Sequence, residues 1–317
     1  MDVSNSHRLV RRPSNNLHQN SANRGFCMPV ISSTQALVFT DLDGSLLDHD
    51  SYSFDAAKPL LEELETKAIP VIPITSKTFA EVEQLRITLN NRHPFIVENG
   101  AAIAIPTKYF PTIPQHWAEE SGYWIIANSK PRQHWNNLLE DIAQDFEGEF
   151  ETFASIVSDR GLKGIQDITG LSLDQAELSN KRKYSEPIHW LGSAQRKQEF
   201  IDKLSAAGGT LLQGGRFLAL GDKVNKGSTL LQLVKIYQQL NSLEEVHSLA
   251  IGDSGNDISM LEAATSAIII RSKIHMPPTL NRKNNLLISS DFGPQGWAES
   301  VSIWLKNSLE IGSKNYG

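Results

Sequence analysis

The stretch Ala36-Leu37-Val38-Phe39-Thr40-Asp41-Leu42-Asp43-Gly44-Ser45 decides how the rest of this chain is interpreted. Its first five residues form an apolar run typical of a buried parallel strand, and two aspartates one residue apart follow directly. Side chains two apart in a strand share a face, and Gly44 lets the chain turn sharply after them. The pattern predicts a crevice where two carboxylates hold a divalent cation against a phosphate.

Three further apolar segments have the character of buried parallel strands, at residues 69–75, 248–252 and 267–270. Helices are expected from near Asp55 and over residues 226–240, because their apolar residues recur at helical spacing. Residues 95–105 are typical of a hairpin with Asn99-Gly100 at its turn. Pro70 and Pro73 count against the strand at 69–75, since a central strand rarely tolerates proline. The alternation predicts an α/β fold with a doubly wound, mostly parallel sheet.

The 317 residues suffice for two domains. Residues 35–111 and 222–317 carry the strand–helix alternation and are predicted to form one core domain, whereas residues 112–221 are predicted to be an inserted second domain. Residues 1–34 are basic and rich in Ser and Asn, and they lack the apolar segment of a signal peptide. A disordered tail is expected there, with an organelle transit peptide as the alternative.

The composition excludes several classes of protein. Hydrophobic residues make up 40%, charged residues 21%, and the net charge of −6 gives no electrostatic signature of nucleic-acid binding. The single cysteine, Cys27, excludes an internal disulfide framework and a multi-cysteine zinc site. No apolar run approaches the length of a membrane span. We therefore expect a cytoplasmic enzyme acting on a small molecule, with neither nucleic acid nor membrane as partner and an unknown oligomeric state.

The first motif fits phosphoryl transfer, which requires a nucleophile, charge neutralisation and positioning. Asp41 would attack phosphorus and form an aspartyl-phosphate, and Asp43 would act as general acid and then general base. Mg²⁺ suits this carboxylate pair. An EF-hand calcium loop is the nearest alternative, but its sixth and twelfth positions are Leu46 and Tyr52 instead of glycine and glutamate.

A second motif, Gly252-Asp253-Ser254-Gly255-Asn256-Asp257, also follows an apolar segment. Asp253 can complete the carboxylate set for the cation, while Asn256 and Asp257 can orient water and neighbouring side chains. Gly-Asp-Ser-Gly also surrounds the nucleophile of chymotrypsin-like proteases. The parallel α/β pattern and the lone cysteine argue against that alternative.

Two single residues complete the set. Thr75 ends the second predicted strand, where its hydroxyl could bind a phosphoryl oxygen or merely cap the strand. Lys226 opens a predicted helix and could neutralise charge on the nucleophile and the phosphoryl group, aided by the positive end of the helix. The alternative for Lys226 is a solvated surface lysine.

In their order along the chain, Asp41-Leu42-Asp43-Gly44-Ser45, Thr75, Lys226 and the Asp253 motif resemble the four motifs of the haloacid dehalogenase-like phosphatases. The resemblance implies Asp41 as nucleophile, Asp43 as acid and base, Thr75 as phosphate ligand and Lys226 as charge stabiliser. It also implies that the insert is an α/β cap that closes on substrate. The candidate ligands for Mg²⁺ are four aspartates: Asp41, Asp43 (through its backbone oxygen), Asp253 and Asp257.

Further segments are similar to the mannosyl-3-phosphoglycerate phosphatases. They are Ile74-Thr75-Ser76-Lys77-Thr78, Glu98-Asn99-Gly100-Ala101-Ala102, Ser158-Asp159-Arg160-Gly161, Tyr184-Ser185-Glu186-Pro187, Gly214-Gly215-Arg216-Phe217 and Gly293-Pro294-Gln295-Gly296-Trp297. One departure is Gly255, where a proline is common. The candidate substrate-binding residues are polar or cationic: Ser76, Lys77, Arg160, Ser185, Glu186, Arg216 and Asn256. Lys181 and Arg182 are further candidates, although Lys181-Arg182-Lys183 is also typical of a solvated charge run.

The resemblance thus implies a Mg²⁺-dependent hydrolase that converts mannosyl-3-phosphoglycerate to the compatible solute mannosylglycerate and phosphate. The alternatives within the superfamily are a phosphatase of glucosyl-3-phosphoglycerate or of the sucrose-phosphate type, and a phosphomannomutase. A silent sugar-phosphate-binding protein is the non-enzyme alternative. It would be expected to have lost a carboxylate or the lysine, and the sequence retains all of them.

Overall fold

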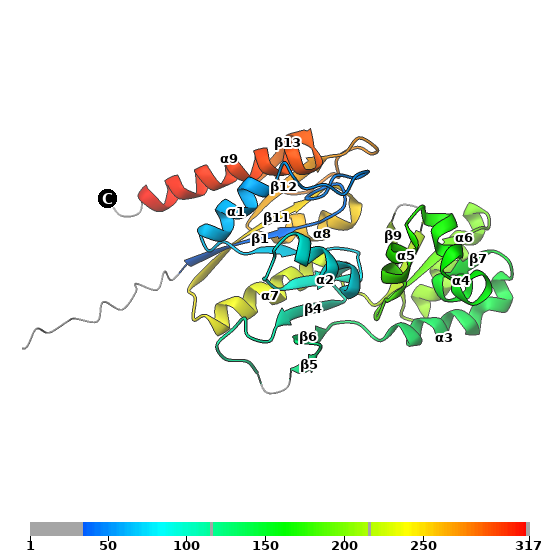
Figure 1. Ribbon diagram of the computed structural model, residues 1–317. Helices are drawn as coiled ribbons and strands as arrows, with labels where there is room; N and C mark the ends of the chain where they lie inside the picture. Colours follow the sequence, from blue (N-terminus) through cyan, green and yellow to red (C-terminus); the bar gives the residue numbers. More distant parts are fainter. Residues whose placement is uncertain (1–33, 115–116, 215–216, 315–317) are drawn as a thin grey trace, which may run out of the picture. The chain divides into compact units, whose positions relative to one another are not determined.

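Five parallel strands form the central sheet of the computed structural model, which describes residues 34–114, 117–214 and 217–314 (Figure 1). Their order is β13-β12-β11-β1-β2, and their bounds are β1 Thr34–Thr40, β2 Val71–Pro73, β11 Glu245–Gly252, β12 Ser266–Arg271 and β13 Leu286–Phe292. The four predicted strands are confirmed, and β13 is an addition. The predicted tail lies outside the described residues except for Thr34. Among the helices described, none is long and apolar enough to cross a membrane.

Pro73 is tolerated in β2 because its nitrogen faces away from the neighbouring strand β1. Ile74 N–H donates to Thr40 O of β1, whereas the next residue, Thr75, donates to Ile96 O on the opposite side. Successive residues of a parallel strand bond to alternate neighbours, so the nitrogen of Pro73 faces away from β1. On that far side the only pairing described is an isolated bridge between Ile74 and Ile96. Pro73 therefore removes no ladder bond to β1.

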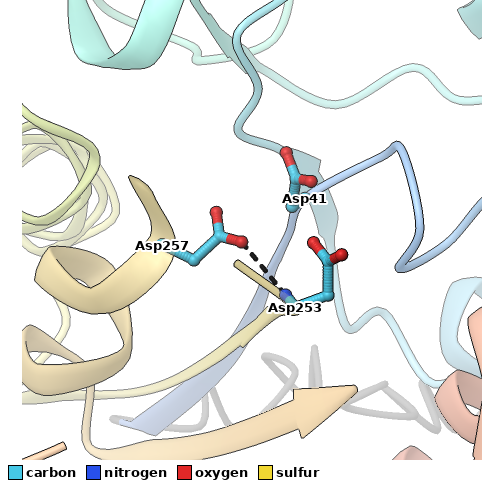
Figure 2. Close-up of side chains that lie close together, drawn as sticks. All are labelled: Asp41, Asp253 and Asp257. Carbon is cyan, nitrogen blue, oxygen red and sulfur yellow. Dashed lines mark hydrogen bonds between the residues drawn. The ribbon is translucent and has the colours of Figure 1, made fainter. Parts of the chain in front are cut away.

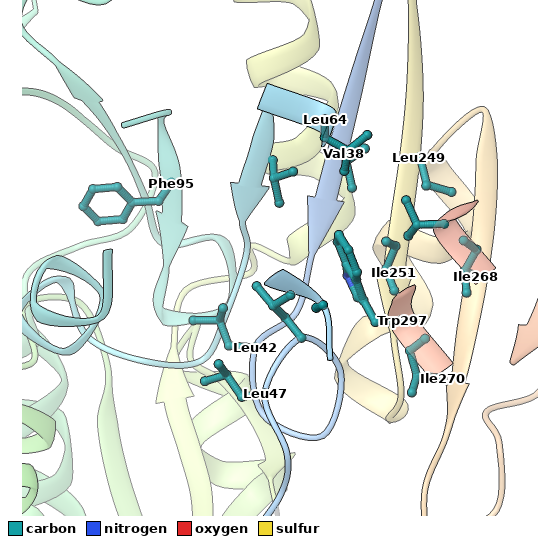
Figure 3. Close-up of a cluster of buried hydrophobic side chains, with 14 of the residues drawn as sticks. Val38, Leu42, Leu47, Leu64, Phe95, Leu249, Ile251, Ile268, Ile270 and Trp297 are labelled. Carbon is teal, nitrogen blue, oxygen red and sulfur yellow. The ribbon is translucent and has the colours of Figure 1, made fainter. Parts of the chain in front are cut away.

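Helices cover both faces of the sheet, which confirms the doubly wound architecture. Val38 of β1 packs with Leu64 of α1 (Lys58–Thr66) and Trp297 of α9 (Gly293–Lys314) (Figure 3). Its neighbour Phe39 points to the other face, where it packs in one cluster with α7 (Lys226–Leu240) and α8 (Ile258–Ala263). Alternate residues of a strand face opposite sides, so a strand buried on both faces must be apolar throughout.

A smaller antiparallel sheet, in the order β3-β4-β6-β5, lies beside α2 (Phe79–Thr88) and contains the predicted hairpin. Its strands are β3 Phe95–Val97, β4 Ala102–Pro106, β5 Ala118–Glu120 and β6 Tyr123–Ala127. The hairpin turn spans four residues between the paired Val97 and Ala102, with positive φ at Glu98, Asn99 and Gly100. We call the 3₁₀ segment Glu98–Gly100 the η1 turn.

A second four-stranded antiparallel sheet, in the order β7-β8-β10-β9, carries four helices of its own. The bounds are β7 Phe150–Thr152, β8 Glu186–Trp190, β9 Thr210–Gly214, β10 Phe217–Gly221, α3 Arg132–Ile142, α4 Phe153–Thr169, α5 Leu173–Asn180 and α6 Ala194–Ala206. A short 3₁₀ segment, Ala143–Phe146, follows α3. Trp135 of α3 and Phe200 of α6 pack on Ile188 of β8. We call residues 130–222 the insert.

The boundaries of the inserted domain remain a prediction. β5 and β6 lie within the range 112–221 assigned to it from the sequence, yet β6 pairs with β4. Strand pairing therefore favours a start near residue 128. The two ends of the insert meet, because Lys130 N–H donates to the Asp222 carboxylate at 3.1 Å.

Candidate active site

Three buried aspartates meet at the carboxyl ends of adjacent strands (Figure 2). Asp41 follows β1 and Asp253 follows β11, and these strands pair side by side up to Thr40 and Ile251. Asp257 ends the 3₁₀ turn that follows Asp253, and its Oδ2 accepts the Asp253 backbone N–H at 3.0 Å. Each residue offers a carboxylate oxygen within 4.8 Å of the others. The structure thus brings together carboxylates from both sequence motifs.

Gly44 is required by the geometry of the turn after Asp41. Its φ is +76°, in the left-handed region, and a Cβ built on it would lie 2.7 Å from Asp253 Oδ2. Any side chain here would therefore strain the backbone and collide with a carboxylate of the cluster. The glycine predicted to turn the chain also makes room for Asp253.

Lys226 is the first residue of α7 and its side chain is fully buried. Its Nζ donates to Asp41 Oδ1 at 2.7 Å and to Asp257 Oδ1 at 2.6 Å. Burial acts to lower the pKa of Lys226, but the charges of Asp257 and Asp41 raise it on balance above its ordinary value. Lys226 is therefore a buried cation held between two carboxylates, and the surface alternative is wrong.

One lysine does not neutralise this cluster. Burial raises the pKa of Asp41 well above its ordinary 3.8, with Lys226 opposing and Asp257 and Asp253 adding to the rise. Burial, followed by the charge of Asp257, raises the pKa of Asp253 to about 7. Crowded carboxylates with too little compensating charge fit a divalent cation, which takes oxygen ligands.

His275 is a neighbour of the cluster that sequence reasoning missed. Its Nε2 lies 3.1 Å from Asp253 Oδ2. It belongs to the irregular segment between β12 and β13, where no periodicity or motif marks a site residue. No signal in the sequence could have placed it here.

Asp43 and Thr75 lie beside the cluster. Asp43 Oδ2 pairs with Lys77 Nζ at 2.8 Å, and within the part of the chain described its Oδ1 is buried without a hydrogen-bond partner. Burial acts to lower the pKa of Lys77, but Asp43 raises it on balance. Thr75 is buried, and its Oγ1 accepts the Lys77 backbone N–H at 3.2 Å. This acceptor role leaves the Thr75 hydroxyl proton available to a phosphoryl oxygen.

A cavity of about 650 Å³ opens over the carboxylates. The core contributes Asp41, Asp43, Ser76, Asn99, Asp253 and Asn256 to its lining, and the insert contributes Phe153, Arg182, Pro187, Leu212 and Phe217. A larger hollow of about 870 Å³ along α2 holds none of the three clustered aspartates. The cavity of about 650 Å³ is therefore the candidate active site, because Asp41 and Asp253 of the cluster line it.

The described residues predicted to bind substrate fall into two groups in the structure: some line the cavity and others do not. Ser76 and Asn256 line the cavity. Arg160 is not among the described residues that line the cavity; its Nη2 donates to Glu151 Oε1 at 2.7 Å. Glu186 is fully buried, where it pairs with Arg132 and accepts Ala154 N–H at 3.0 Å near the start of α4.

Ser185 is buried and donates to Glu98 Oε2 at 2.6 Å. Arg216 lies outside the described residues. The substrate roles given to these residues stay predictions.

The family follows from comparison with known proteins. Residues 38–155 and 191–275 match the profile of the haloacid dehalogenase-like hydrolases, and the chain belongs to this family. Two relatives carry the name glucosyl-3-phosphoglycerate/mannosyl-3-phosphoglycerate phosphatase. The one from Methanococcoides burtonii is 33% identical over 265 residues, 84% of this chain and 95% of that enzyme. The one from Persephonella marina is 34% identical over 284 residues, 87% of this chain and 99% of that enzyme.

Solved structures support the fold. A phosphatase of the haloalkanoate superfamily from Bacteroides thetaiotaomicron has a TM-score of 0.60 and 16% identity, covering 88% of this chain and 98% of its own. The sucrose-phosphatase of Synechocystis, solved with sucrose and phosphate, has a TM-score of 0.55 and 16% identity, covering 85% and 97%. At such identities the likeness shows a shared architecture. The predicted family and fold are both confirmed.

Proposed function

We propose that this hydrolase removes phosphate from mannosyl-3-phosphoglycerate to give mannosylglycerate and phosphate. Its class, phosphoric monoester hydrolase, follows from the family and from phosphatase relatives that match nearly their whole length. The observation that carries the proposal is that Asp41, held by the buried Lys226, lines a cavity together with Asp253, and the insert contributes the other wall of that cavity. Glucosyl-3-phosphoglycerate is the second candidate substrate, because the names of both relatives include it.

Asp41 is the proposed nucleophile. Its Oδ1 is held by Lys226, which leaves the other oxygen to attack phosphorus. The new bond joins Asp41 to phosphorus, and the bond from phosphorus to the substrate's C3 oxygen breaks. Asp43 supplies a proton to the leaving oxygen and later takes one from the water that releases phosphate and restores Asp41. Thr75 would donate its hydroxyl to the phosphoryl group.

The donor set fits Mg²⁺. The carboxylates of Asp41 and Asp253 and the backbone oxygen of Asp43 are the proposed ligands, with Asp257 as a further candidate. Both oxygens of Asp257 already accept hydrogen bonds, from Lys226 and from the N–H groups of Asp253 and Ser254, so it also orients the other groups. When bound, the cation offsets the charge of the carboxylates and of the phosphoryl oxygens.

The test is Mg²⁺-dependent release of phosphate from a matched set of compounds. These are mannosyl-3-phosphoglycerate, glucosyl-3-phosphoglycerate, 3-phosphoglycerate and simple hexose phosphates. We expect kcat/KM at least about tenfold higher for a glycosylated compound than for 3-phosphoglycerate, about 1.4 kcal/mol of added transition-state binding. A higher value for hexose phosphates would overturn the proposed substrate. Activity that needs a bisphosphate activator and releases little phosphate would indicate a mutase.

A further inference from the structure

Arg182 is placed differently from the two lysines that flank it. Lys181 is exposed and Lys183 is partly exposed, and they pair with Glu177 and Glu120, respectively, on the surface. The Arg182 side chain is only 13% exposed and lines the cavity over the carboxylates. The charge run predicted from the sequence thus divides into two solvated lysines and one arginine that faces the site.

Hydrogen bonds hold the guanidinium of Arg182 in place, but they do not use all of its N–H donors. Its Nη1 donates to Ser76 O at 3.2 Å and to Ser185 Oγ at 3.2 Å. Its Nε is buried without a partner in the described part of the chain. Ser76 follows Thr75 directly, so the guanidinium is tied to the segment proposed to bind phosphate. Among the described residues that line the cavity, Arg182 is the only lysine or arginine.

Glu98 of the η1 turn holds the segment that carries Arg182. Its Oε1 accepts Lys183 N–H at 2.9 Å, and its Oε2 accepts Tyr184 N–H at 3.2 Å and Ser185 Oγ–H at 2.6 Å. The carboxylate is almost fully buried and lies 3.9 Å from Arg182 Nη1. Because three closer donors satisfy Glu98, Arg182 is restrained without being fully neutralised.

On the basis of the proposed function, we propose that Arg182 binds the glycerate carboxylate of the substrate and that Glu98 is its positioning residue. The substrate carries two anionic groups. Its phosphate belongs at Asp41 and Lys226, so the carboxylate needs a second cationic donor within the same cavity. A guanidinium with an unused N–H edge is suited to a planar carboxylate, and a buried arginine of this kind discriminates between charged and neutral groups.

The experiment compares mannosyl-3-phosphoglycerate with its carboxylate methyl ester, which lacks that negative charge and carries one added methyl group. The measured quantity is the ratio of kcat/KM for the acid to kcat/KM for the ester. We expect a ratio of about 100 in the wild type and near 1 in Arg182→Gln, with the change for the acid appearing mainly in KM. Lys163→Gln, at an exposed lysine that is not part of the cavity lining, is the matched control and keeps the wild-type ratio.

Glu98→Gln should lower the acid-to-ester ratio about tenfold, since a displaced guanidinium affects only the charged compound. A merely structural role of Glu98 would lower both kcat/KM values alike and leave the ratio unchanged. Both kcat/KM values come from the same preparation of a variant, so their ratio can be measured even when the variant is partly destabilised. Arg182→Met, which is also neutral and should likewise give a ratio near 1, serves if Arg182→Gln does not fold.

Two outcomes separate the two proposals. A wild-type ratio retained in Arg182→Gln, or lost in Arg216→Gln alone, overturns the assignment of Arg182 while the proposed function stands. Failure of the wild type to release phosphate from either compound, although it hydrolyses other phosphate esters, overturns the proposed function itself.

Discussion

Lys226 Nζ lies 2.7 Å from Asp41 Oδ1, although 185 residues separate the two in sequence. The same ammonium donates to Asp257 Oδ1 at 2.6 Å, so one cation links the end of β1 to the loop after β11. The whole group is buried, where an unpaired charge is costly. The proposed nucleophile is therefore held by an interaction that also stabilises the fold.

Lys226→Met should destabilise the protein strongly, because it leaves two buried carboxylates without their cation. The expected loss in the free energy of unfolding is about 3–5 kcal/mol. Urea denaturation at pH 7.5 in EDTA measures it. Lys163→Met is the matched control, since Lys163 pairs with Asp167 at an exposed site where about 1 kcal/mol or less is expected. Equal losses in the two variants would contradict a structural role for Lys226.

Asp41→Asn should abolish turnover while preserving the fold. Loss of the covalent step is expected to lower kcat at least about a thousandfold. Because the pKa of Asp41 is raised by burial, a neutral amide there should leave Tm unchanged or higher. Phosphate release and thermal unfolding measure the two effects, with the exposed Asp50→Asn as control. Wild-type rates in Asp41→Asn would remove Asp41 from its role.

Mg²⁺ should raise Tm, and Asp253→Asn should lose most of that rise because it removes a proposed ligand. Saturation at about 100 times Kd corresponds to about 2.7 kcal/mol of stabilisation. Thermal unfolding in EDTA and in MgCl₂ measures the difference independently of activity. Asp222→Asn, outside the cluster, is the control. An undiminished rise in Asp253→Asn would place the cation elsewhere.

Acid should destabilise the protein through His93, whose ring bridges Tyr109 and Glu65 at 2.8 and 2.7 Å. Burial lowers the pKa of His93 below its ordinary 6.5, with Glu65 opposing, so the folded state favours the neutral ring. The contribution of the neutral His93 ring to the free energy of unfolding is fully present above pH 6.5, the ordinary pKa. It is lost as the pH falls through the lowered pKa that His93 has in the folded state.

Measured as Tm between pH 7.5 and 5, the acid-induced loss should be smaller in His93→Gln than in the wild type. His247→Gln, at a more exposed histidine, is the control and should show the wild-type loss. The same pH profile in His93→Gln and wild type would contradict the prediction.

Gly100→Ala should disturb the η1 turn more than an ordinary left-handed glycine would. A Cβ at Gly100 would lie 2.5 Å from Asn225 O, directly before Lys226, whereas a Cβ at Gly148 would meet nothing within 4 Å. Both glycines have positive φ, so Gly148→Ala isolates the backbone strain of about 1–2 kcal/mol. We expect Gly100→Ala to cost at least about 1 kcal/mol more by urea denaturation, from overpacking. Equal costs would show that the neighbouring backbone yields.

The sequence predicts the central sheet and the carboxylate cluster for one physical reason. Parallel strands present their carboxyl ends at one edge, so polar residues that end two apolar runs must meet there. β13 escaped prediction because Ser289, Ser290 and Asp291 interrupt its apolar pattern. An edge strand with exposed residues tolerates such residues, and most of β13 is not fully buried.

The positions of Glu98 and Arg182 could not be predicted in the same way. A glutamate in a hairpin turn and an arginine between two lysines are both typical of solvated surface. Only the approach of residues 182–185 to the η1 turn buries them, and that contact joins segments more than 80 residues apart. Sequence periodicity describes neighbours along the chain and carries no information about such an encounter.

The bond between Lys130 and Asp222 has an evolutionary consequence. A segment that departs from and rejoins the rest of the chain at a single point can be exchanged by recombination without breaking the strands that anchor Asp41 and Asp253. Replacement of the insert alone would thus change substrate preference, while the catalytic residues of the core and the reaction stay the same.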